Sequence, residues 1–460
     1  MSLLRLNEPA GRRLLVTAVA GSGMVFLDGT VANVALPKIG DELDADLAGL
    51  QWVINGYTLT LAAFILVGGS LGDRLGRKRV FAWGTAGFAL TSVMVAVAPT
   101  IETLVAARLL QGLAAALMTP GSLALLQASF HPDDRMKAIG AWTGMLGIAT
   151  AGGPVLGGWL VDIDWRIAFW INLPLSAVVL WLLRSAPESR SSEASGRYDY
   201  AGLILAPVAL AGITWALTAW PDDHTPAAAI IGGLAAGGFV IAQRRGSHPM
   251  TPPDLFGSRV FTAINVVTLF VYAALAGSMF FLAVYLQVSA GWSPLEAGAA
   301  TVPVSIVMLL LASWFGGYGT RHGARTPMLA GCLVLAAGLA LLALAPDQPD
   351  YLVHILPGVL LQGLGLSMLV APLTGTVLAA VPDSRSGVAS GINNAVSRTA
   401  GLLAVAALPL MVGLTGDQYR VPHLVADAYR SAMWWCALWV LAGAALTVIG
   451  LPGRPRDERA

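Results

Sequence analysis

The sequence is poor in charged residues and in cysteine. Asp, Glu, Lys and Arg make up 12% of its 460 residues, whereas a soluble globular domain carries about 25%. The net charge of +1 provides no electrostatic basis for binding nucleic acid. Cys332 and Cys436 both lie in apolar segments, so we expect packed thiols rather than a disulfide or metal ligands. The six histidines are scattered, and no metal or cofactor is expected.

The sequence also lacks the motifs of enzymes that bind nucleotides. Glycine is frequent, but the glycine-rich segment 69–79 does not fit the phosphate-loop pattern and follows a long apolar segment rather than a strand. One acid and two arginines well inside the apolar segments offer no nucleophile and no metal site, so we expect no enzyme. Any work that the protein performs must therefore draw on an ion gradient or on the gradient of its own substrate.

Long apolar runs are what the sequence has instead, because 56% of its residues are hydrophobic and its mean hydropathy is +0.71. A bilayer core needs about 20 apolar residues per helix, and continuous runs do not predict the alternating strands of a barrel. We therefore predict an all-α integral membrane protein with fourteen transmembrane helices. They are 14–37, 50–71, 80–98, 103–129, 137–161, 167–183, 200–219, 227–242, 260–289, 294–319, 327–345, 351–380, 387–413 and 431–451.

The basic residues predict how these helices are oriented. The first run is too long for a secretory signal core of about 7–15 residues, so we interpret it as an uncleaved helix with its N-terminus in the cytoplasm. Of the 27 Lys and Arg, 21 then fall in inner loops and termini, four in outer loops, and two, Arg108 and Arg398, inside spans. This bias is typical of cytoplasmic loops. We expect a multi-pass monomer in the lipid bilayer of the bacterial cytoplasmic (inner) membrane, with both termini cytoplasmic.

Several motifs recur about 250 residues apart. The sequence of 109–112, Leu-Leu-Gln-Gly, returns at 360–363, and each copy is followed by a proline and then by a polar loop, 132–135 or 382–385. The loop 72–78 has a weaker copy at 319–325. We therefore predict two six-helix halves, residues 1–190 and 251–460, separated by an inserted helix pair in residues 191–250. Repeated halves are typical of transporters that bind a substrate between the repeats near the bilayer midplane.

Motifs along nearly the whole chain carry a family resemblance. They are Leu27–Pro37 in the first run, Gln51–Tyr57 in the second, Gly72–Arg79 after it, Arg108–Gly112 in the fourth, Gly147–Gly158 in the fifth, and Trp165–Arg166 with Asn172–Pro174 at the sixth. In this order they resemble the fourteen-helix drug:proton antiporter family of the major facilitator superfamily.

The resemblance implies a major facilitator fold and proton-coupled export of amphipathic drugs or antibiotics by alternating access. One alternative is a facilitator or symporter that imports or exports a specific metabolite, although the fifth-helix glycine motif counts against import. The other is a membrane protein with no transport activity, such as a receptor or a membrane-embedded enzyme.

Asp28 is a carboxylate well inside the first predicted span. A charge at the bilayer centre costs about 2.5–3.5 kcal/mol on insertion scales, so such a group usually faces a cavity. Placed between apolar surroundings and a nearby cation, it can bind and release a proton. We hypothesise that Asp28 couples transport to protons, or shares that role with recognition of a cation. The alternative is a static hydrogen bond that holds the first helix. Arg108 either pairs with Asp28, with the role in proton transfer that the resemblance implies, or extends its head to the outer interface.

The predicted substrate cavity draws on the first, second, fourth and fifth helices and their counterparts. Its candidate polar or aromatic lining residues are Trp52, Asn55, Tyr57, Gln127, Trp142, Gln287, Gln362 and Asn393. Each of them is equally consistent with helix packing. Arg398 lies in an otherwise apolar run near Asn393, and either contacts an anionic substrate or bonds to backbone carbonyls. A pocket of aromatics with few charges suits large amphipathic molecules.

Two motifs are candidates for gating. Asp73, Arg74, Gly76 and Arg77 lie in the tight loop after the second span. Asp73 placed against a helix N-terminus or a neighbouring arginine would hold the cytoplasmic side shut, whereas the basic residues alone would only set the orientation. The second-half copy has Thr320 in place of the aspartate, so gating by this motif is expected on one side only.

The second gating candidate is the glycine-rich fifth span. Gly153 and Gly157 form a small-xxx-small face that permits a close helix contact, and Pro154 can bend the helix. We expect this contact to prevent ion leak, and ordinary membrane packing is the alternative.

Overall fold

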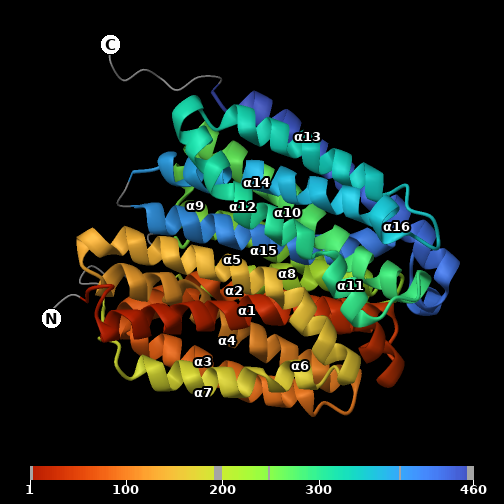
Figure 1. The fold of residues 1–460 in the computed structure, drawn as a ribbon, viewed down its shortest axis with the longest axis horizontal. Helices are drawn as coiled ribbons and strands as arrows, with labels where there is room; N and C mark the ends of the chain where they lie inside the picture. Colours follow the sequence, from red (N-terminus) through yellow and green to blue (C-terminus); the bar gives the residue numbers. More distant parts are fainter. Residues whose placement is uncertain (1–3, 191–198, 247–248, 383–384, 453–460) are drawn as a thin grey trace.

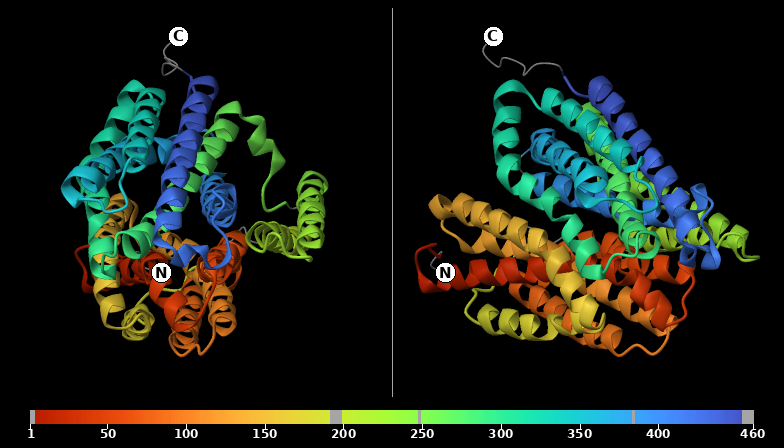
Figure 2. Two further views of the ribbon diagram at one scale, coloured as in Figure 1. Left: turned by 90° about the vertical axis from the view of Figure 1, so that its right-hand side faces the viewer. Right: turned by 45° about the vertical axis from the view of Figure 1, so that its right-hand side comes forward.

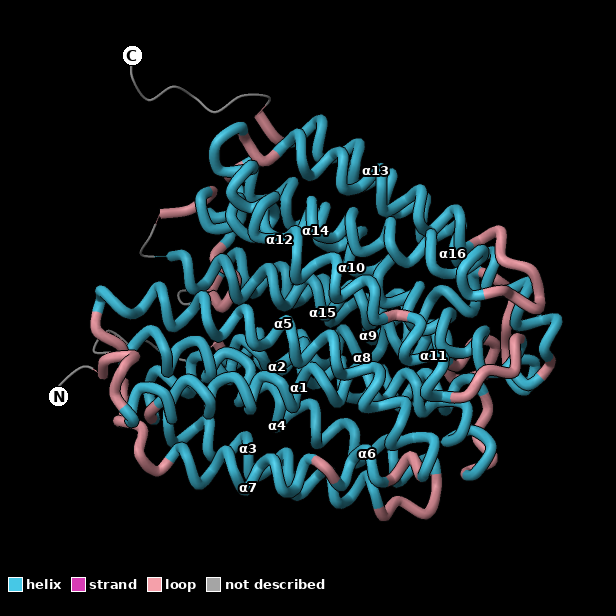
Figure 3. Tube along the Cα trace, in the orientation of Figure 1, coloured by secondary structure: helices cyan, strands magenta, loops and turns pink. Residues whose placement is uncertain are grey.

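The structure is a computed structural model that describes residues 4–190, 199–246, 249–382 and 385–452. In these ranges every regular element is a helix (Figure 3), and the one β-bridge joins Leu4 to Phe130. The all-α prediction is therefore confirmed.

The first half contains seven helices, because the sixth predicted span is broken at Ile171. The helices are α1 (Pro9–Glu42), α2 (Leu47–Leu75), α3 (Arg77–Ala96), α4 (Ile101–Ser129), α5 (Pro132–Ile163), α6 (Ile167–Trp170) and α7 (Asn172–Leu183). Polar side chains cap the N-termini of several helices. Asp46 accepts a hydrogen bond from the Gly49 amide at 2.8 Å at the N-terminus of α2, and Thr100 caps α4.

The inserted pair and the second half follow. The inserted pair is α8 (Tyr200–Thr218) and α9 (Thr225–Arg245). The second half contains η1 (Pro253–Gly257), α10 (Arg259–Val284), η2 (Tyr285–Ser289), α11 (Pro294–Ala300), α12 (Val302–His322), α13 (Arg325–Leu342), η3 (Tyr351–Ile355), α14 (Leu356–Ala379), α15 (Ser386–Met411), η5 (Gly416–Arg420) and α16 (Pro422–Gly450). Here η2 and η3 are π-helical turns continuous with α10 and α14.

Fourteen apolar segments match the fourteen predicted spans. Thirteen helices in the described chain are long and apolar enough to cross a membrane, and Ile167–Leu183 forms a shorter fourteenth segment. The last helix begins at Pro422, nine residues before the predicted span, because its polar first turns continue the helix beyond the apolar run. Large apolar side chains such as Leu234 and Leu310, 71% and 69% exposed, cover outward faces, as lipid contact requires.

The two halves lie against each other, and the inserted pair stands beside them (Figures 1 and 2). Helices α1 to α7 pack together, as do α10 to α16, and α9 packs on α8. Helix α8 contacts α2 of the first half and α15 of the second, so the inserted pair is placed over the boundary between the halves.

Asp199 forms hydrogen bonds that hold the N-terminus of the inserted helix pair. Its carboxylate accepts hydrogen bonds from the Gly202 amide at 2.7 Å, the Gln243 side chain at 2.5 Å and the Met250 amide at 3.1 Å. Burial raises the pKa of Asp199, but the hydrogen bonds from Gln243, Gly202 and Met250 lower it, and the pKa lies below its usual value. One side chain therefore joins α8, the end of α9 and the segment that leads to α10.

The predicted repeat is visible in the helix ends and interiors. Gly76 ends α2 with a φ of 115° and Gly323 ends α12 with a φ of 90°, so both copies of the loop use the conformation that glycine permits. Pro120 lies inside α4 and Pro372 inside α14. The corresponding motifs thus occupy corresponding helices of the two halves.

The halves converge at one end of the molecule and diverge towards the end with the chain termini (Figure 2, right). We call the latter the basic end, defined by loops 72–79, 130–135 and 184–190, and the opposite one the far end, defined by loops 43–46, 164–166 and 412–421.

Hydrogen bonds between the halves concentrate at and near the far end. Arg420 donates to Asp44 at 2.8 Å, and the Tyr419 hydroxyl donates to the Ala45 carbonyl at 2.8 Å. Gln51 of α2 donates to the Val405 carbonyl of α15 at 2.7 Å. Among the interactions between described residues, none of the hydrogen bonds or ion pairs joins the halves at the basic end. The far end is therefore the closed end.

Candidate functional site

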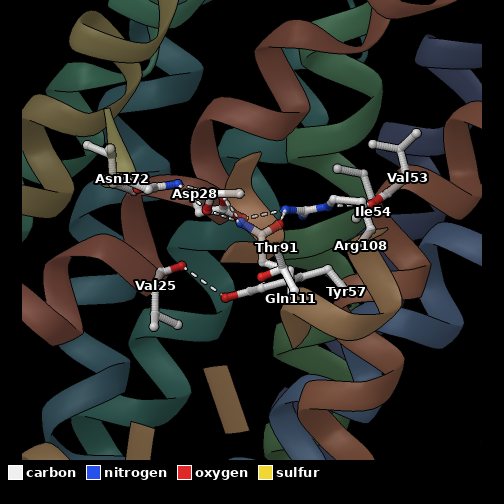
Figure 4. A network of polar contacts seen from close by, with 12 residues as sticks. Val25, Asp28, Val53, Ile54, Tyr57, Thr91, Arg108, Gln111 and Asn172 are labelled. Carbon is white, nitrogen blue, oxygen red and sulfur yellow. Dashed lines mark hydrogen bonds and ion pairs between the residues drawn. The ribbon is translucent and has the colours of Figure 1, made fainter. Parts of the chain in front are cut away.

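Asp28 lies at the centre of a buried polar network in the first half (Figure 4). It is 1% exposed and lies 14 residues before the end of α1, about 21 Å along the helix. One carboxylate oxygen forms an ion pair with Arg108 of α4. The other accepts hydrogen bonds from Gln111 at 3.0 Å and from Asn172 at 3.3 Å. Side chains from three further positions thus converge on the one acid.

Arg108 points into the bundle rather than towards an interface. It is 1% exposed, and its Nε donates to the Val53 carbonyl of α2 at 3.0 Å. The guanidinium also donates to Gln111 at 2.7 Å and lies 4.4 Å from the centroid of the Tyr57 ring, within the range of a cation–π contact. The structure therefore has the pairing that we considered from the sequence, and the alternative of a head at the outer interface is wrong.

Three partners in this network were not singled out from the sequence. Gln111 is three residues after Arg108 on α4, a spacing that places two side chains on the same helix face, so it could have been found. Ser92 of α3 accepts from Gln111 at 2.9 Å and from Asn172 at 3.2 Å. Nothing in the sequence marks Ser92, because serine is common in membrane helices. Asn172 is the first residue of α7 and reaches Asp28 from there.

The network can connect proton binding to helix packing. An ionised Asp28 is compensated by Arg108 and by two amide donors, whereas a protonated Asp28 would leave the Arg108 charge without its counterion in an apolar region. Removing one partner of a buried pair costs about 3–5 kcal/mol. A proton on Asp28 would therefore change how strongly α1 is held to α4.

Among the predicted lining residues, Tyr57, Trp142 and Asn393 have partners within their own halves. Tyr57 joins the network, and its hydroxyl donates to the Val25 carbonyl at 3.3 Å (Figure 4). Trp142 of α5 donates to Ser22 of α1 at 3.3 Å. Asn393 of α15 donates to Thr268 of α10 at 2.8 Å, so its amide is used in packing inside the second half.

Two other predicted lining residues contact elements outside their half. Trp52 packs on Trp215 of α8 with 5.6 Å between ring centroids, so its ring contacts the inserted pair. Whether it also lines the substrate cavity stays a prediction. Gln287 donates to the Val34 carbonyl of α1 at 3.0 Å. It therefore helps to close the boundary between the halves.

Asn55 and Gln362 are buried amides whose side-chain atoms have no hydrogen-bond partner in the described structure. Asn55 lies one helical turn after Gln51 on α2, and Gln362 is the repeat counterpart of Gln111. The structure does not bring these two residues together with Asp28, and Gln127 is exposed.

Arg398 lies at the boundary between the halves. It is 12 residues into α15. Its guanidinium is 5.5 Å from the centroid of the Phe26 ring on α1. Its Nε is buried and has no hydrogen-bond partner in the described residues.

The proposed gating loop folds on its own half. Asp73 accepts a hydrogen bond from Arg77, one helical turn later, at 2.9 Å, which matches the neighbouring arginine that we expected. Glu188, which follows α7, accepts from the Lys78 amide at 3.1 Å and lies against Gly76. In the second-half copy, Thr320 donates to the Gly317 carbonyl at 2.8 Å. Whether either loop gates transport stays a prediction.

The glycines of α5 lie where the helix makes its closest contacts. A Cβ at Gly153 would be 3.0 Å from Thr30, and one at Gly157 would be 2.6 Å from Val31, both on α1. On the other side, a Cβ at Gly298 of α11 would be 2.2 Å from the Pro154 carbonyl. Small residues thus let α5 touch its own half and the opposite half at once.

No metal site is formed by the described residues, since no group of three or more His, Cys, Asp or Glu comes together among them. The protein fits the class of membrane transporters that are built from two repeated helical halves. The chain belongs to the Major Facilitator Superfamily, whose family model matches residues 18–405. It is therefore a multi-pass membrane transporter and not an enzyme.

Its relatives include antibiotic resistance proteins. The chain is 34% identical over 414 residues to the tetracenomycin C resistance and export protein of Streptomyces glaucescens, covering 88% of this chain and 77% of that one. It is 34% identical over 423 residues to the multidrug resistance protein Stp of Mycobacterium tuberculosis, covering 90% and 78%. These relatives are consistent with the resemblance to fourteen-helix drug:proton antiporters.

The fold is also that of solved transporters. A bacterial homolog of the human lysosomal transporter Spinster superposes with a TM-score of 0.69 at 17% identity, covering 96% of this chain and 97% of that one. A D-xylose–proton symporter superposes with a TM-score of 0.68 at 14% identity, covering 96% and 98%. At these identities the likeness shows the fold alone.

Proposed function

We propose that the protein exports amphipathic drugs or antibiotics across the bacterial cytoplasmic membrane in exchange for protons. The observation that carries the proposal is the buried ion pair between Asp28 and Arg108, because a charge in this position is costly unless it is used. The names of the relatives, which include resistance and export proteins, support export rather than import. The basic end would face the cytoplasm, with both termini on that side.

The proton would act through the helices that meet at the network. Arg108 holds the Asp28 carboxylate of α1 and the Val53 carbonyl of α2. The same two helices carry contacts to the second half, through Val34, six residues after Asp28, and Gln51, two residues before Val53. Exchange requires the proton to enter from outside and to leave into the cytoplasm, so Asp28 would be protonated while the far end is open. Release of that proton on the cytoplasmic side would let Asp28 pair with Arg108 and hold α1 against α4, as in the form with the closed far end. This form would then bind the compound and carry it outwards.

In the opposite phase the basic end would close. The ion pair of Asp73 with Arg77 braces the loop between α2 and α3, and Arg74 and Gly76 would present this loop to the second half. The close contact of Gly153, Pro154 and Gly157 would keep the boundary sealed against protons throughout the cycle. Each of these roles belongs to the proposal.

Transport by inverted membrane vesicles tests the function. A susceptibility panel in a pump-deficient host first identifies an exported compound, and its uptake is then measured with an imposed pH gradient. We expect Asp28→Asn to lose at least about tenfold of the gradient-driven uptake, since the variant side chain cannot exchange a proton. Asp162→Asn, which removes an exposed carboxylate at the end of α5, is the matched control and should transport normally.

Two outcomes would contradict the proposal. Full gradient-driven uptake by Asp28→Asn would exclude this residue as the coupling group. Uptake that follows only the gradient of the compound, in the wild type as well, would indicate a facilitator instead.

A further inference from the structure

Charges in the middle of the membrane helices are few, and their balance is uneven. Among the charged residues of the predicted spans, Asp28, Arg108 and Arg398 lie five or more residues from either end of their span. Asp28 and Arg108 neutralise each other within the first half. Neither of these two residues neutralises Arg398, so the boundary between the halves carries its positive charge.

Arg398 is placed for contact with a molecule between the halves. It lies 12 residues from the start of α15 and 13 from its end, which puts it about 18 Å along the helix and near its middle. Its guanidinium lies 5.5 Å from the centroid of the Phe26 ring of the opposite half. An aromatic ring of α1 and a cation of α15 therefore face each other across the boundary.

The guanidinium has unused hydrogen-bonding capacity. Within the described residues no carboxylate lies within ion-pair distance of Arg398, and its buried Nε has no hydrogen-bond partner. The bonds to backbone carbonyls that the sequence left open are absent among the described residues. Arginine carries five N–H donors in a planar fork that matches carboxylate and similar anions, and a buried donor without a partner costs about as much as a lost hydrogen bond.

The one acid nearby does not offer a site for a cation. The Asp28 carboxylate is 1% exposed, and its two oxygens already accept from Arg108, Gln111 and Asn172. Among the described residues, a cationic compound between the halves would therefore meet the positive charge of Arg398 and no carboxylate that is free to pair with it.

We propose that Arg398 is the anion-recognising residue of the substrate site, and that the protein binds amphipathic aromatic compounds with a negatively charged group such as a carboxylate, sulfonate or phenolate. The charged group pairs with the Arg398 guanidinium, and the rings of the compound pack on Phe26. This inference rests on the proposed export function and specifies the charge of its substrate.

Equilibrium binding to the full chain in lipid nanodiscs tests the inference without a proton gradient. The probes are naphthalene-2-sulfonate and 2-naphthyltrimethylammonium, which share a ring system and carry opposite charges, and calorimetry measures both. We expect the wild type to bind the anion at least about tenfold more tightly than the cation, as a charge-assisted hydrogen bond permits.

Substitutions at one position extend the test. Arg398→Gln should lose at least about tenfold in affinity for the sulfonate, Arg398→Lys should keep most of it, and Arg398→Glu should reverse the preference towards the cation. Arg321→Gln removes an exposed arginine at the end of α12 and should bind like the wild type. Thermal unfolding establishes that each variant is folded. If a variant does not fold, the preference of the wild type for the anion over the cation can still be measured.

Equal affinity for the two ions, binding of neither ion, or unchanged sulfonate binding by folded Arg398→Gln would overturn the inference. Because binding is measured at equal pH on both sides, these outcomes are independent of proton coupling. If Asp28→Asn kept full proton-driven uptake, the preference for an anionic substrate would be unaffected. If the preference for the anion were absent, the result for proton coupling would be unaffected.

Discussion

At the scale of single residues, the buried pair of Asp28 and Arg108 is the least expected feature on stability grounds. Taking both charges out of water costs several kcal/mol per ion, and well-packed apolar residues in place of such a pair are often as stable or more stable. The pair is nevertheless supported by Gln111, Asn172 and Ser92. We infer that its value lies in transport rather than in folding.

A double-mutant cycle measures how strongly the pair is coupled. Asp28→Asn and Arg108→Gln each leave one side of the pair in an apolar region, so each should destabilise the protein by about 3–5 kcal/mol. The double variant should lose clearly less than the sum, because neither charge then remains. Unfolding by denaturant in detergent micelles gives the values.

The exposed ion pair at the far end is the control for this cycle. The side chains of Asp44 and Arg420 are 92% and 37% exposed, and such pairs contribute about 0–1 kcal/mol. The cycle of Asp44→Asn and Arg420→Gln should therefore show little coupling. Additive losses for the buried pair would mean that the two groups do not depend on each other.

At the scale of elements, α5 is the helix that joins the halves most closely. A Cβ at Gly158 would be 2.6 Å from the Pro294 carbonyl oxygen and 2.7 Å from the Leu295 Cα of α11. Both neighbours are backbone atoms, so they cannot rotate away as a side chain does. By contrast, a Cβ at Gly152, on the same helix, meets nothing within 4 Å.

Gly158→Ala should therefore weaken the closed far end, whereas Gly152→Ala should not. Overpacking costs about 1–3 kcal/mol, and each 1.4 kcal/mol changes a conformational population about tenfold. Spin labels at the exposed residues 41 and 417 report the separation of the halves at the far end. We expect a longer distance to become populated in Gly158→Ala, and an unchanged distribution in that variant would show that this contact does not hold the far end closed.

At the scale of the whole molecule, the protein consists of two halves that are joined at the far end and diverge at the basic end (Figure 2). Exchange of an anionic compound for protons would move charge across the membrane in addition to solute. If one monovalent anion leaves as one proton enters, the equivalent of two positive charges moves inwards. A 1:1 exchange of a monovalent cation for a proton moves none.

The membrane potential should therefore drive export by itself. Each charge that crosses 100 mV contributes about 2.3 kcal/mol, so the anion exchange would gain about 4.6 kcal/mol. In inverted vesicles at equal pH, a potassium diffusion potential with a positive lumen should cause accumulation of naphthalene-2-sulfonate. Vesicles that lack the protein are the control, and indifference to the potential would exclude this stoichiometry.

The sequence by itself determined the class of the protein and its plan. Fourteen apolar runs, the alternation of basic loops and the repeat of Leu-Leu-Gln-Gly with its proline are local or periodic properties. They predict helices, orientation and two halves because hydrophobic length and charge act on each segment independently of its neighbours. Asp28 and Arg108 were found in the same way, since a charge in an apolar run is visible without a structure.

Only the tertiary structure decided which side chains meet. The partnership of Asp28 with Gln111 and Asn172 joins residues 83 and 144 positions apart, and the placement of Trp52 on the inserted pair and of Arg398 against Phe26 depends on helix rotation. A rotation of one residue, about 100° around the helix, moves a side chain from the centre to the lipid. Such angles are set by packing among all helices together, and no single segment contains them.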